Sequence, residues 1–266
     1  GLPTPDVNLE IHSGSHAEQT GKIMIEFDKV LNQYPTDLVL VVGDVNSTVA
    51  CALVAAKRGI RVAHVEAGLR SNDRTMPEEL NRIVTDHLSD FLFTTEPEGD
   101  TNLQREGIPA ERIFFVGNVM IDTLLASRER AQQHPGLQEL ALPRKGYAIT
   151  TMHRPSNVDS PEALQNTWRC VKMVTEAIPV VFPMHPRTRA KFQQFGLWEE
   201  LEQQPNLTLL EPQSYLWFLG LMDNARFLFT DSGGIQEEAT VLGVPCLTFR
   251  ENTERPITLV YGTNLL

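Results

Sequence analysis

The stretch HVEAGLRSNDRTMPEELNR concentrates charged side chains around one loop. Glu66 and Glu78 stand on its two sides, and the loop between them contains Arg70, Asp73 and Arg74. The apolar run at residues 60–65 predicts a strand, and the residues after the proline at position 77 predict a helix. Carboxylates where a strand hands over to a loop are placed for chemistry, and their type is that of general acid/base catalysis.

A second group of residues suits an anionic ligand. DSGG follows the apolar run ARFLFT and opens a predicted helix, so the backbone N–H groups of Ser232, Gly233 and Gly234 could hold phosphate oxygens. Glu238 lies one helical turn further on, where a carboxylate could bind ribose hydroxyls, and Arg255 offers a cation. The alternative is an ordinary glycine-rich helix start.

Histidines follow two further apolar runs. His153 is followed by Arg154 in TTMHRPS, and His185 lies near Arg187 in FPMHPRT. A single histidine in such a place is usually structural. Two at matching strand ends, each near an arginine, predict a site for a phosphorylated ligand.

Five polar residues are expected at the carboxyl ends of strands, where open α/β sheets bind ligands: Asp44, Glu66, His153, His185 and Asp231. We expect them to face one cleft. Structural alternatives remain, because Asp44 could cap the next helix. Glu66 and Glu78 could also only brace the loop by pairing with Arg70, Arg74 or Arg82, since Glu78 and Arg82 are four residues apart.

Strands and helices alternate along the chain. DLVLVVGD, IRVAHVEA and FLFTTE predict strands in the first half, and GYAITTMH, IPVVFPMH, LTLLEP, ARFLFT and VPCLTF do so in the second. Helices are predicted between them, including residues 161–177, one from Tyr215 and one ending at Leu242. This order predicts an α/β fold with parallel strands and crossover helices. The strands lack apolar/polar alternation, which favours burial on both faces.

The pattern divides the chain into two domains, residues 1–140 and 145–266, joined by a linker rich in proline, glycine and polar residues. A doubly wound domain normally opens with a strand, but here a helix predicted near Ser15 comes first. The chain stops at YGTNLL without a closing helix. We expect the first domain to lack its opening strand and loop and the second its last helix, as in a fragment or a trimmed fold.

The composition excludes several classes of protein. A net charge of −11 over 266 residues argues against a nucleic-acid surface. No apolar run approaches the roughly 18–20 residues of a membrane helix, and no signal peptide is recognisable, so a cytoplasmic protein is expected. The three cysteines lie far apart without CxxC spacing, which predicts reduced thiols and neither disulfide nor zinc site.

Several motifs together resemble the non-hydrolysing UDP-N-acetylglucosamine 2-epimerases. They are HVEAGLRS followed by PEELNR, the GD after the first strand, the HR pair, the PMH turn and DSGGIQEEATVLGVPCLTFRENTERP. The resemblance runs from SGSHAEQT to TERPIT, over nearly the whole chain. It implies two Rossmann-like domains in a GT-B arrangement with a UDP-sugar in the cleft between them. The family's glycine-arginine-proline-glutamate loop is absent from this sequence.

The resemblance also implies roles for individual residues. Asp44, Glu66 and Glu78 match the acid/base carboxylates, and His185 matches a histidine near the diphosphate. Gln213 and Phe218 match residues beside the uracil. The phosphates and ribose would be held by Ser232, Gly233, Gly234, Glu238 and Arg255, and His153 and Arg154 are taken as substrate-binding residues.

The implied reaction interconverts UDP-GlcNAc and UDP-ManNAc by eliminating UDP to a 2-acetamidoglucal and adding it back. It needs an acid and a base on different sides of the sugar, and no cofactor or metal is expected. We expect a UDP-sugar as substrate, a homodimer, and neither nucleic acid nor membrane as partner. The alternatives are a hydrolysing 2-epimerase, a GT-B glycosyltransferase and a UDP-sugar-binding module without turnover.

Overall fold

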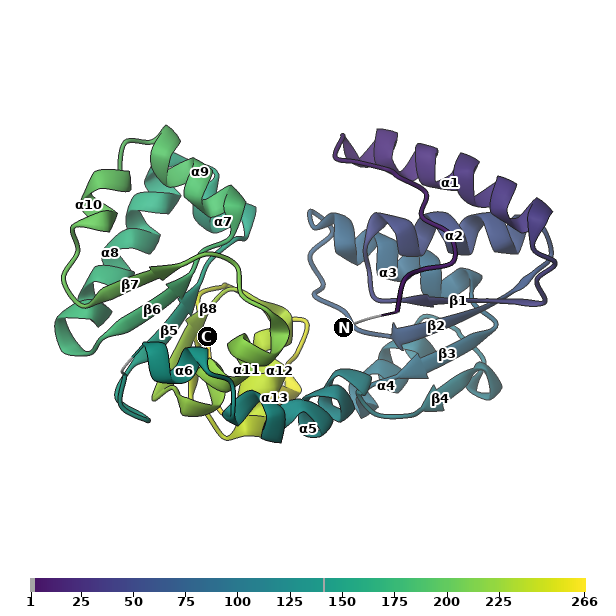
Figure 1. The fold of residues 1–266 in the computed structure, drawn as a ribbon. Helices are drawn as coiled ribbons and strands as arrows, with labels where there is room; N and C mark the ends of the chain where they lie inside the picture. The colour runs from purple at the N-terminus through teal and green to yellow at the C-terminus, as the bar shows by residue number, and fades with distance from the viewer. Residues whose placement is uncertain (1–2, 141) are drawn as a thin grey trace. The chain divides into compact units, whose positions relative to one another are not determined.

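The chain forms two compact units, Gly1–Val119 and Met120–Leu266, in a computed structural model that describes residues 3–140 and 142–266. Figure 1 shows that each unit has its own sheet flanked by helices. Residue 141, within the predicted linker, and residues 1 and 2, within the first predicted domain, lie outside the described residues.

The first unit contains a four-stranded parallel sheet in the order β1-β2-β3-β4. Its strands are β1 (Leu38–Val42), β2 (Arg61–Ala67), β3 (Phe91–Thr94) and β4 (Ile113–Phe115). Its helices are α1 (His16–Gln33), α2 (Asn46–Lys57), α3 (Pro77–Leu88), α4 (Pro97–Arg105) and the 3-10 turn η1 (Ala110–Arg112). The predicted alternation of parallel strands and helices is therefore confirmed for β1 to β3.

Burial on both faces was expected of every strand, and this is wrong for β1. Leu38, Leu40 and Val42 are exposed, whereas Val39 and Val41 are buried, so β1 alternates. The buried residues join a cluster with Leu31 of α1 and Val54 of α2. Helices cover only one face of β1, and its sequence is apolar on the other face as well, so composition alone concealed the alternation.

The second unit contains a six-stranded parallel sheet in the order β10-β9-β8-β5-β6-β7. Its strands are β5 (Ala148–Thr151), β6 (Val180–Pro183), β7 (Leu207–Leu210), β8 (Phe227–Thr230), β9 (Cys246–Thr248) and β10 (Asn264–Leu265). The chain adds β6 and β7 on one side of β5, and it adds β8, β9 and β10 on the other side. The order of strand addition therefore reverses between β5 and β8. Ligands bind at such a switch point in open α/β sheets.

Longer helices of the second unit cover the sheet. They are α5 (Val119–Gln132), α8 (Pro161–Ala177), α9 (Pro186–Gln194), α11 (Tyr215–Asn224) and α12 (Gly233–Leu242). Four shorter helices are α6 (Gly136–Glu139), α7 (Pro155–Val158), α10 (Trp198–Glu202) and α13 (Ile257–Val260). Residues 161–177 form the predicted helix, since Ser160 caps its first turn by accepting from the Ala163 N–H at 3.1 Å.

Helix α5 lies within the second unit, although the sequence interpretation assigned its residues to the first domain. Arg128 and Gln132 of α5 both contact the buried carboxylate of Asp223 at the end of α11, with Arg128 Nη2 2.8 Å from Asp223 Oδ1. A buried carboxylate needs such partners. These contacts fasten α5 to α11. The two units divide after Val119, the first residue of α5, so the predicted linker falls inside the second unit.

Candidate active site

Glu66 occupies an unusual place in β2. The register of β2 with β3 shifts between Val65 and Ala67, so Glu66 is the extra residue of a β-bulge. Its φ is +70°, in the left-handed region that a non-glycine residue seldom adopts. A bulge re-aims a side chain, and such backbone strain is concentrated at functional sites. The structure therefore singles out the carboxylate that the sequence proposed.

Asp44 follows β1 and is held from α3. Arg82 Nε lies 3.0 Å from Asp44 Oδ2, and Asn81 Nδ2 donates to the Asp44 carbonyl at 2.8 Å. Helix α2 has Val45 as its N-cap, without a side-chain cap hydrogen bond. Asp44 is therefore not a helix cap, and its half-exposed carboxylate stays at the strand end.

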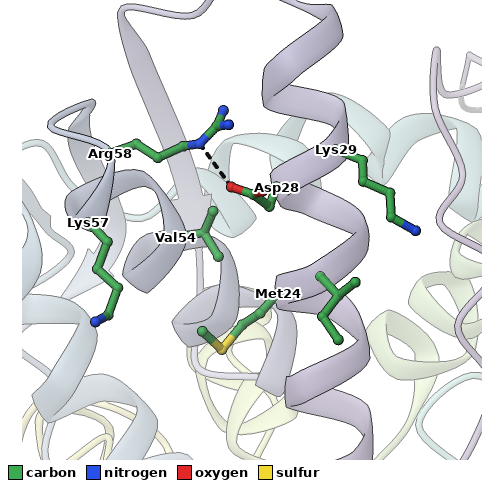
Figure 2. A pocket seen from close by; sticks show the side chains of 7 residues that line it. Met24, Asp28, Lys29, Val54, Lys57 and Arg58 are labelled. Atoms are coloured by element: carbon green, nitrogen blue, oxygen red, sulfur yellow. Dashed lines mark ion pairs between the residues drawn. The ribbon is translucent and has the colours of Figure 1, made fainter.

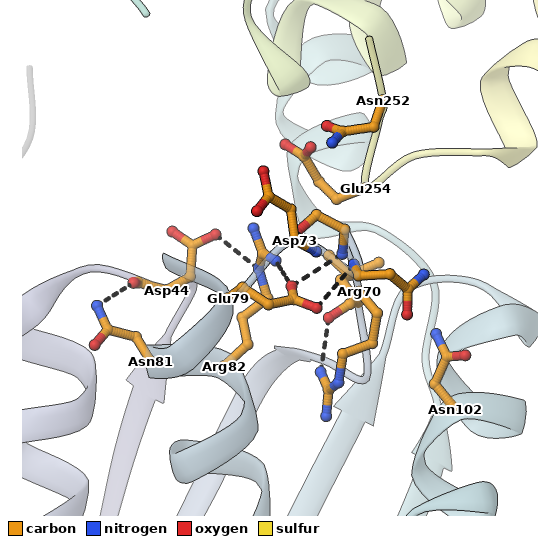
Figure 3. A network of polar contacts seen from close by, with 12 residues as sticks. Asp44, Arg70, Asp73, Glu79, Asn81, Arg82, Asn102, Asn252 and Glu254 are labelled. Carbon is orange, nitrogen blue, oxygen red and sulfur yellow. Dashed lines mark hydrogen bonds and ion pairs between the residues drawn. The ribbon is translucent and has the colours of Figure 1, made fainter. Parts of the chain in front are cut away.

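Glu78 and Glu79 are neighbours in the first turn of α3 with different surroundings. Glu79 is buried and accepts from the backbone N–H groups of Ser71 and Asn72, at 2.9 and 3.0 Å, and it pairs with Arg82 (Figure 3). Glu78 is half-buried and makes no ion pair or side-chain hydrogen bond within residues 3–140 and 142–266. The suggested Glu78–Arg82 brace is therefore wrong, and Glu79 braces the loop instead.

Arg70 does not brace the predicted carboxylates either. Its Nη2 contacts Asp86 Oδ2 and Glu106 Oε2, both at 2.7 Å. Arg82 and Arg70 thus hold Glu79, Asp86 and Glu106, none of which the sequence interpretation had selected. Partner choice depends on side-chain direction, which spacing along the chain does not encode.

In the second unit, Asp231 organises the switch point. It follows β8, is fully buried, and accepts from the backbone N–H groups of His153 and Arg154, at 3.0 and 2.8 Å. His153 Nδ1 lies 2.9 Å from its Oδ1, and Asn157 Nδ2 lies 3.0 Å from its Oδ2. Burial acts to raise the pKa of Asp231, but hydrogen bonds from His153, Arg154 and Asn157 outweigh it and hold the pKa below its usual value.

His185 follows β6, and His153 follows the neighbouring strand β5. The two rings lie 5.9 Å apart between centroids. His185 is exposed and caps α9 through Nδ1, which accepts from the Arg187 N–H at 3.2 Å. Partial desolvation of the ring lowers the pKa of His185 most, and the nearby His153 and Arg187 lower it further. The expected strand-end placement of His153, His185 and Asp231 is confirmed for this sheet.

The glycine-rich start of α12 lies at the same edge of the sheet. Ser232 is its N-cap and makes no side-chain cap hydrogen bond, and Gly233 begins the helix. The first turn of a helix presents N–H groups without intrahelical acceptors, which suits an anion. The Glu254 carboxylate lies so close that a Cβ on Gly233 would collide with it, whereas one on Gly234 would meet only the Met120 methyl group at 3.2 Å.

Glu254 was missed by the sequence interpretation. It is buried, its Oε2 lies 2.7 Å from Arg250 Nη1, and its Oε1 lies 3.5 Å from Arg154 Nη2. Burial acts to raise the pKa of Glu254, but Arg250, Arg154 and Arg255 lower it below its usual value. Its position in RENTERP, between two arginines, was the available signal.

The remaining predicted residues differ in accessibility. Glu238 is buried and accepts from Tyr215 Oη at 3.0 Å; burial raises the pKa of Glu238, and this hydrogen bond opposes the shift. Arg255 is buried with its Nε 3.2 Å from Glu237 Oε2. Gln213 donates to the Glu211 carbonyl, and Phe218 packs against the core of the second unit.

A surface pocket of about 430 Å³ lies elsewhere, along α1 and α2. Figure 2 shows its lining residues, which include Met24, Val54 and an ion pair of Asp28 with Arg58 at 2.8 Å. None of the predicted site residues lines it. None of its lining side chains is a candidate catalytic residue that would indicate which ligand binds there.

Across residues 3–140 and 142–266, no group of three or more His, Cys, Asp or Glu side chains is arranged to hold a metal ion. In the same residues, no helix combines the length and apolar character needed to cross a membrane. The three cysteines are free thiols, and Cys246 lies in the core of the second unit.

These features define a two-unit α/β protein with carboxylates beside strand ends in one unit and a glycine-rich helix start in the other. A family model described as UDP-N-acetylglucosamine 2-epimerase matches residues 1–266. The chain therefore belongs to the UDP-N-acetylglucosamine 2-epimerase family, and the family prediction made from its motifs is confirmed.

Individual relatives agree. The UDP-N-acetylglucosamine 2-epimerase of Methanocaldococcus jannaschii is 45% identical over 270 residues, which cover 100% of this chain and 74% of the relative. The UDP-2,3-diacetamido-2,3-dideoxy-D-glucuronate 2-epimerase of Pseudomonas aeruginosa is 40% identical over 269 residues, 100% of this chain and 73% of that protein. Both names are those of sugar-nucleotide 2-epimerases.

A solved structure matches as well. The crystal structure of the Methanocaldococcus jannaschii UDP-GlcNAc 2-epimerase in complex with UDP-GlcNAc and UDP superimposes with a TM-score of 0.94, covering 99% of this chain and 74% of that chain at 45% identity. The predicted fold class, α/β with two Rossmann-like domains of the GT-B class, is confirmed by this match.

Proposed function

We propose that the chain interconverts UDP-GlcNAc and UDP-ManNAc by eliminating UDP and adding it back. One observation carries the proposal: Glu66 is held in a left-handed conformation at a β-bulge in a chain of this family. Such a conformation costs on the order of 1–3 kcal/mol and persists where the surroundings enforce it. A carboxylate that only paired with a neighbouring arginine would not need that backbone.

The proposed reaction requires two proton transfers. A carboxylate removes the C2 proton, the C1–O bond to UDP breaks, and the electron pair leaves with UDP to give a 2-acetamidoglucal. A second acid then protonates C2 from the opposite face while a UDP oxygen re-forms the bond to C1. We assign these transfers to Glu66 and Glu78, with Asp44 as the third carboxylate, because acid and base must approach from different sides.

The second unit is proposed to hold the nucleotide. The N–H groups of Ser232, Gly233 and Gly234 would bind phosphate oxygens, and His185, His153, Arg154 and Arg255 would stabilise the charge of departing UDP. Glu238, oriented by Tyr215, would accept from ribose hydroxyls, and Gln213 and Phe218 would lie beside the uracil. Phe218 packs on the core, so only the edge of its ring would contact the uracil.

A second substrate has one specific observation in its favour. The Pseudomonas relative, 40% identical, is named for a UDP-2,3-diacetamido-2,3-dideoxy-D-glucuronate. The same elimination at C2 would serve that sugar, so both substrates belong in the assay. A homodimer is also proposed, and light scattering would test it. A cytoplasmic location is proposed as well, because the three cysteines are free thiols, which suit a reducing compartment.

Incubation with UDP-GlcNAc in deuterated water tests the function. NMR should show UDP-ManNAc with deuterium at C2, and deuterium should also enter C2 of the remaining UDP-GlcNAc. Epimerised product without C2 label would rule out the elimination. Free ManNAc and UDP as the only products would instead identify a hydrolysing enzyme.

A further inference from the structure

His64 is a fully buried histidine in β2, two residues before Glu66. Its Nε2 lies 2.8 Å from the carbonyl oxygen of Gly43, and its Nδ1 lies 2.6 Å from Asp86 Oδ1. The Gly43 carbonyl can only accept, so Nε2 donates to it, and Nδ1 shares a hydrogen bond with the Asp86 carboxylate. The ring thus links two different segments of the first unit.

The first segment leads into Asp44. The Gly43 N–H donates to the Val65 carbonyl at 3.0 Å, and the Gly43 carbonyl accepts from His64. Gly43 has a φ of +70°, so the chain turns here in a conformation suited to glycine. The peptide groups on both sides of Gly43 are therefore fixed just before the Asp44 side chain departs.

The second segment follows Glu66. Asp86 Oδ2 accepts from the Gly68 N–H at 3.1 Å and from Arg70 Nη2 at 2.7 Å. Gly68 has a φ of +80°, and its carbonyl accepts from Asn102 Nδ2 at 2.9 Å. Asp86 therefore fixes the backbone at Gly68, two residues after Glu66. His64 itself lies two residues before Glu66.

We propose that His64 is a positioning residue for proton transfer, which holds the Asp44 and Glu66 segments in register through Gly43 and Asp86. This inference rests on the proposed function of those two carboxylates. His64 does not itself reach the sugar, because it is buried beneath the strand ends. It acts through the two backbone segments that it joins.

Stability alone does not account for this arrangement. A buried, hydrogen-bonded charged cluster is often no more stabilising than apolar side chains of similar volume. The distinctive feature is that one ring and one carboxylate bind the backbone next to two candidate catalytic groups. Misplacement of a reacting group by about 1 Å can cost on the order of 100-fold in rate.

Two amide substitutions separate the two hydrogen bonds. An asparagine amide reaches the place of Nδ1, so His64→Asn can keep the bond to Asp86 and loses the one to Gly43. A glutamine amide reaches the place of Nε2, so His64→Gln can keep the bond to Gly43 and loses the one to Asp86. Asp86→Asn provides a third variant of nearly unchanged shape. Leu31→Ala, in α1, is the control that loses core packing but removes neither hydrogen bond of His64.

For each variant, kcat, KM and the Kd of UDP are measured well below its melting temperature. We expect kcat to fall at least tenfold in the His64 and Asp86 variants, with KM and the Kd of UDP within about twofold of wild type. Leu31→Ala should lose thermal stability and keep its kcat. Wild-type kcat in folded His64→Asn and His64→Gln, or a parallel loss of UDP affinity, would overturn the positioning role. An inactive wild-type chain would count against the proposed function instead.

Discussion

Arg82 Nε donates to Asp44 Oδ2 at 3.0 Å, and the same buried guanidinium pairs with Glu79 through Nη1. One cation of α3 thus holds a structural carboxylate and a candidate catalytic one. Glu79 in turn accepts from the Ser71 and Asn72 N–H groups, so the pair fixes the loop between β2 and α3 (Figure 3). Glu79 and Arg82 therefore brace this loop, whereas the chemistry is proposed for Glu66 and Glu78.

Removing the Arg82 guanidinium should weaken both the bracing of the loop and the proposed chemistry. Arg82→Ala leaves Glu79 buried without its ion pair, and we expect the free energy of unfolding to fall by about 3–5 kcal/mol. Urea denaturation measures the loss. Arg74→Ala, an exposed arginine of the same loop, should change stability by less than about 0.5 kcal/mol. Equal stability of the two variants would show that the buried pair is not needed.

Substitutions of Glu78 and Glu79, the adjacent glutamates of α3, should have different effects. Glu78→Gln keeps the shape of the side chain but cannot exchange a proton, so kcat should fall by roughly 100-fold or more, as in Glu66→Gln. UDP affinity and melting temperature should barely change. Glu79→Gln should chiefly lower the melting temperature, because Glu79 holds Arg82 and the loop. A folded Glu66→Gln or Glu78→Gln enzyme with wild-type kcat would contradict the catalytic assignment.

The start of α12 can be tested at Gly234. Gly234→Val places a side chain where phosphate should approach the helix N-terminus, and its Cβ meets only the end of the flexible Met120 side chain. Calorimetry should show UDP binding weakened at least tenfold in the folded variant. Gly233→Val is the poorer test, since its Cβ would also collide with Glu254. Unchanged UDP affinity in Gly234→Val would argue against phosphate binding there.

His185 should titrate below its ordinary value of 6.5. Partial desolvation of the ring lowers the pKa of His185 most and the His153 ring adds to this, so His153→Gln should raise the midpoint seen by NMR. Because the folded pKa is the lower one, the His185 contribution to stability is fully present above pH 6.5. It is lost as the pH falls from 6.5 through the folded pKa. A His185 titration midpoint at or above 6.5 would show that its surroundings do not lower its pKa.

Local sequence determined much of this protein. Apolar runs closed by glycine or aspartate predicted the strands, and the proline after Ser160 predicted where α8 begins, because these signals act within a few residues. The motifs also selected Asp44, Glu66 and Asp231 at the ends of their strands and Glu78 in the first turn of α3. The short elements β4, β10 and α13 carried too few residues to show a period.

Only the tertiary structure decided which charged groups meet. Sequence spacing offered Glu78 as an alternative partner of Arg82, yet Arg82 contacts Glu79 and Asp44. The left-handed backbone of Glu66 and the link from His64 to Gly43 were likewise unreadable from the sequence. The physical reason is that hydrogen bonds and ion pairs depend on the directions of side chains brought together from distant segments. A periodic pattern fixes the face of a strand or helix, but it does not fix which atom lies opposite.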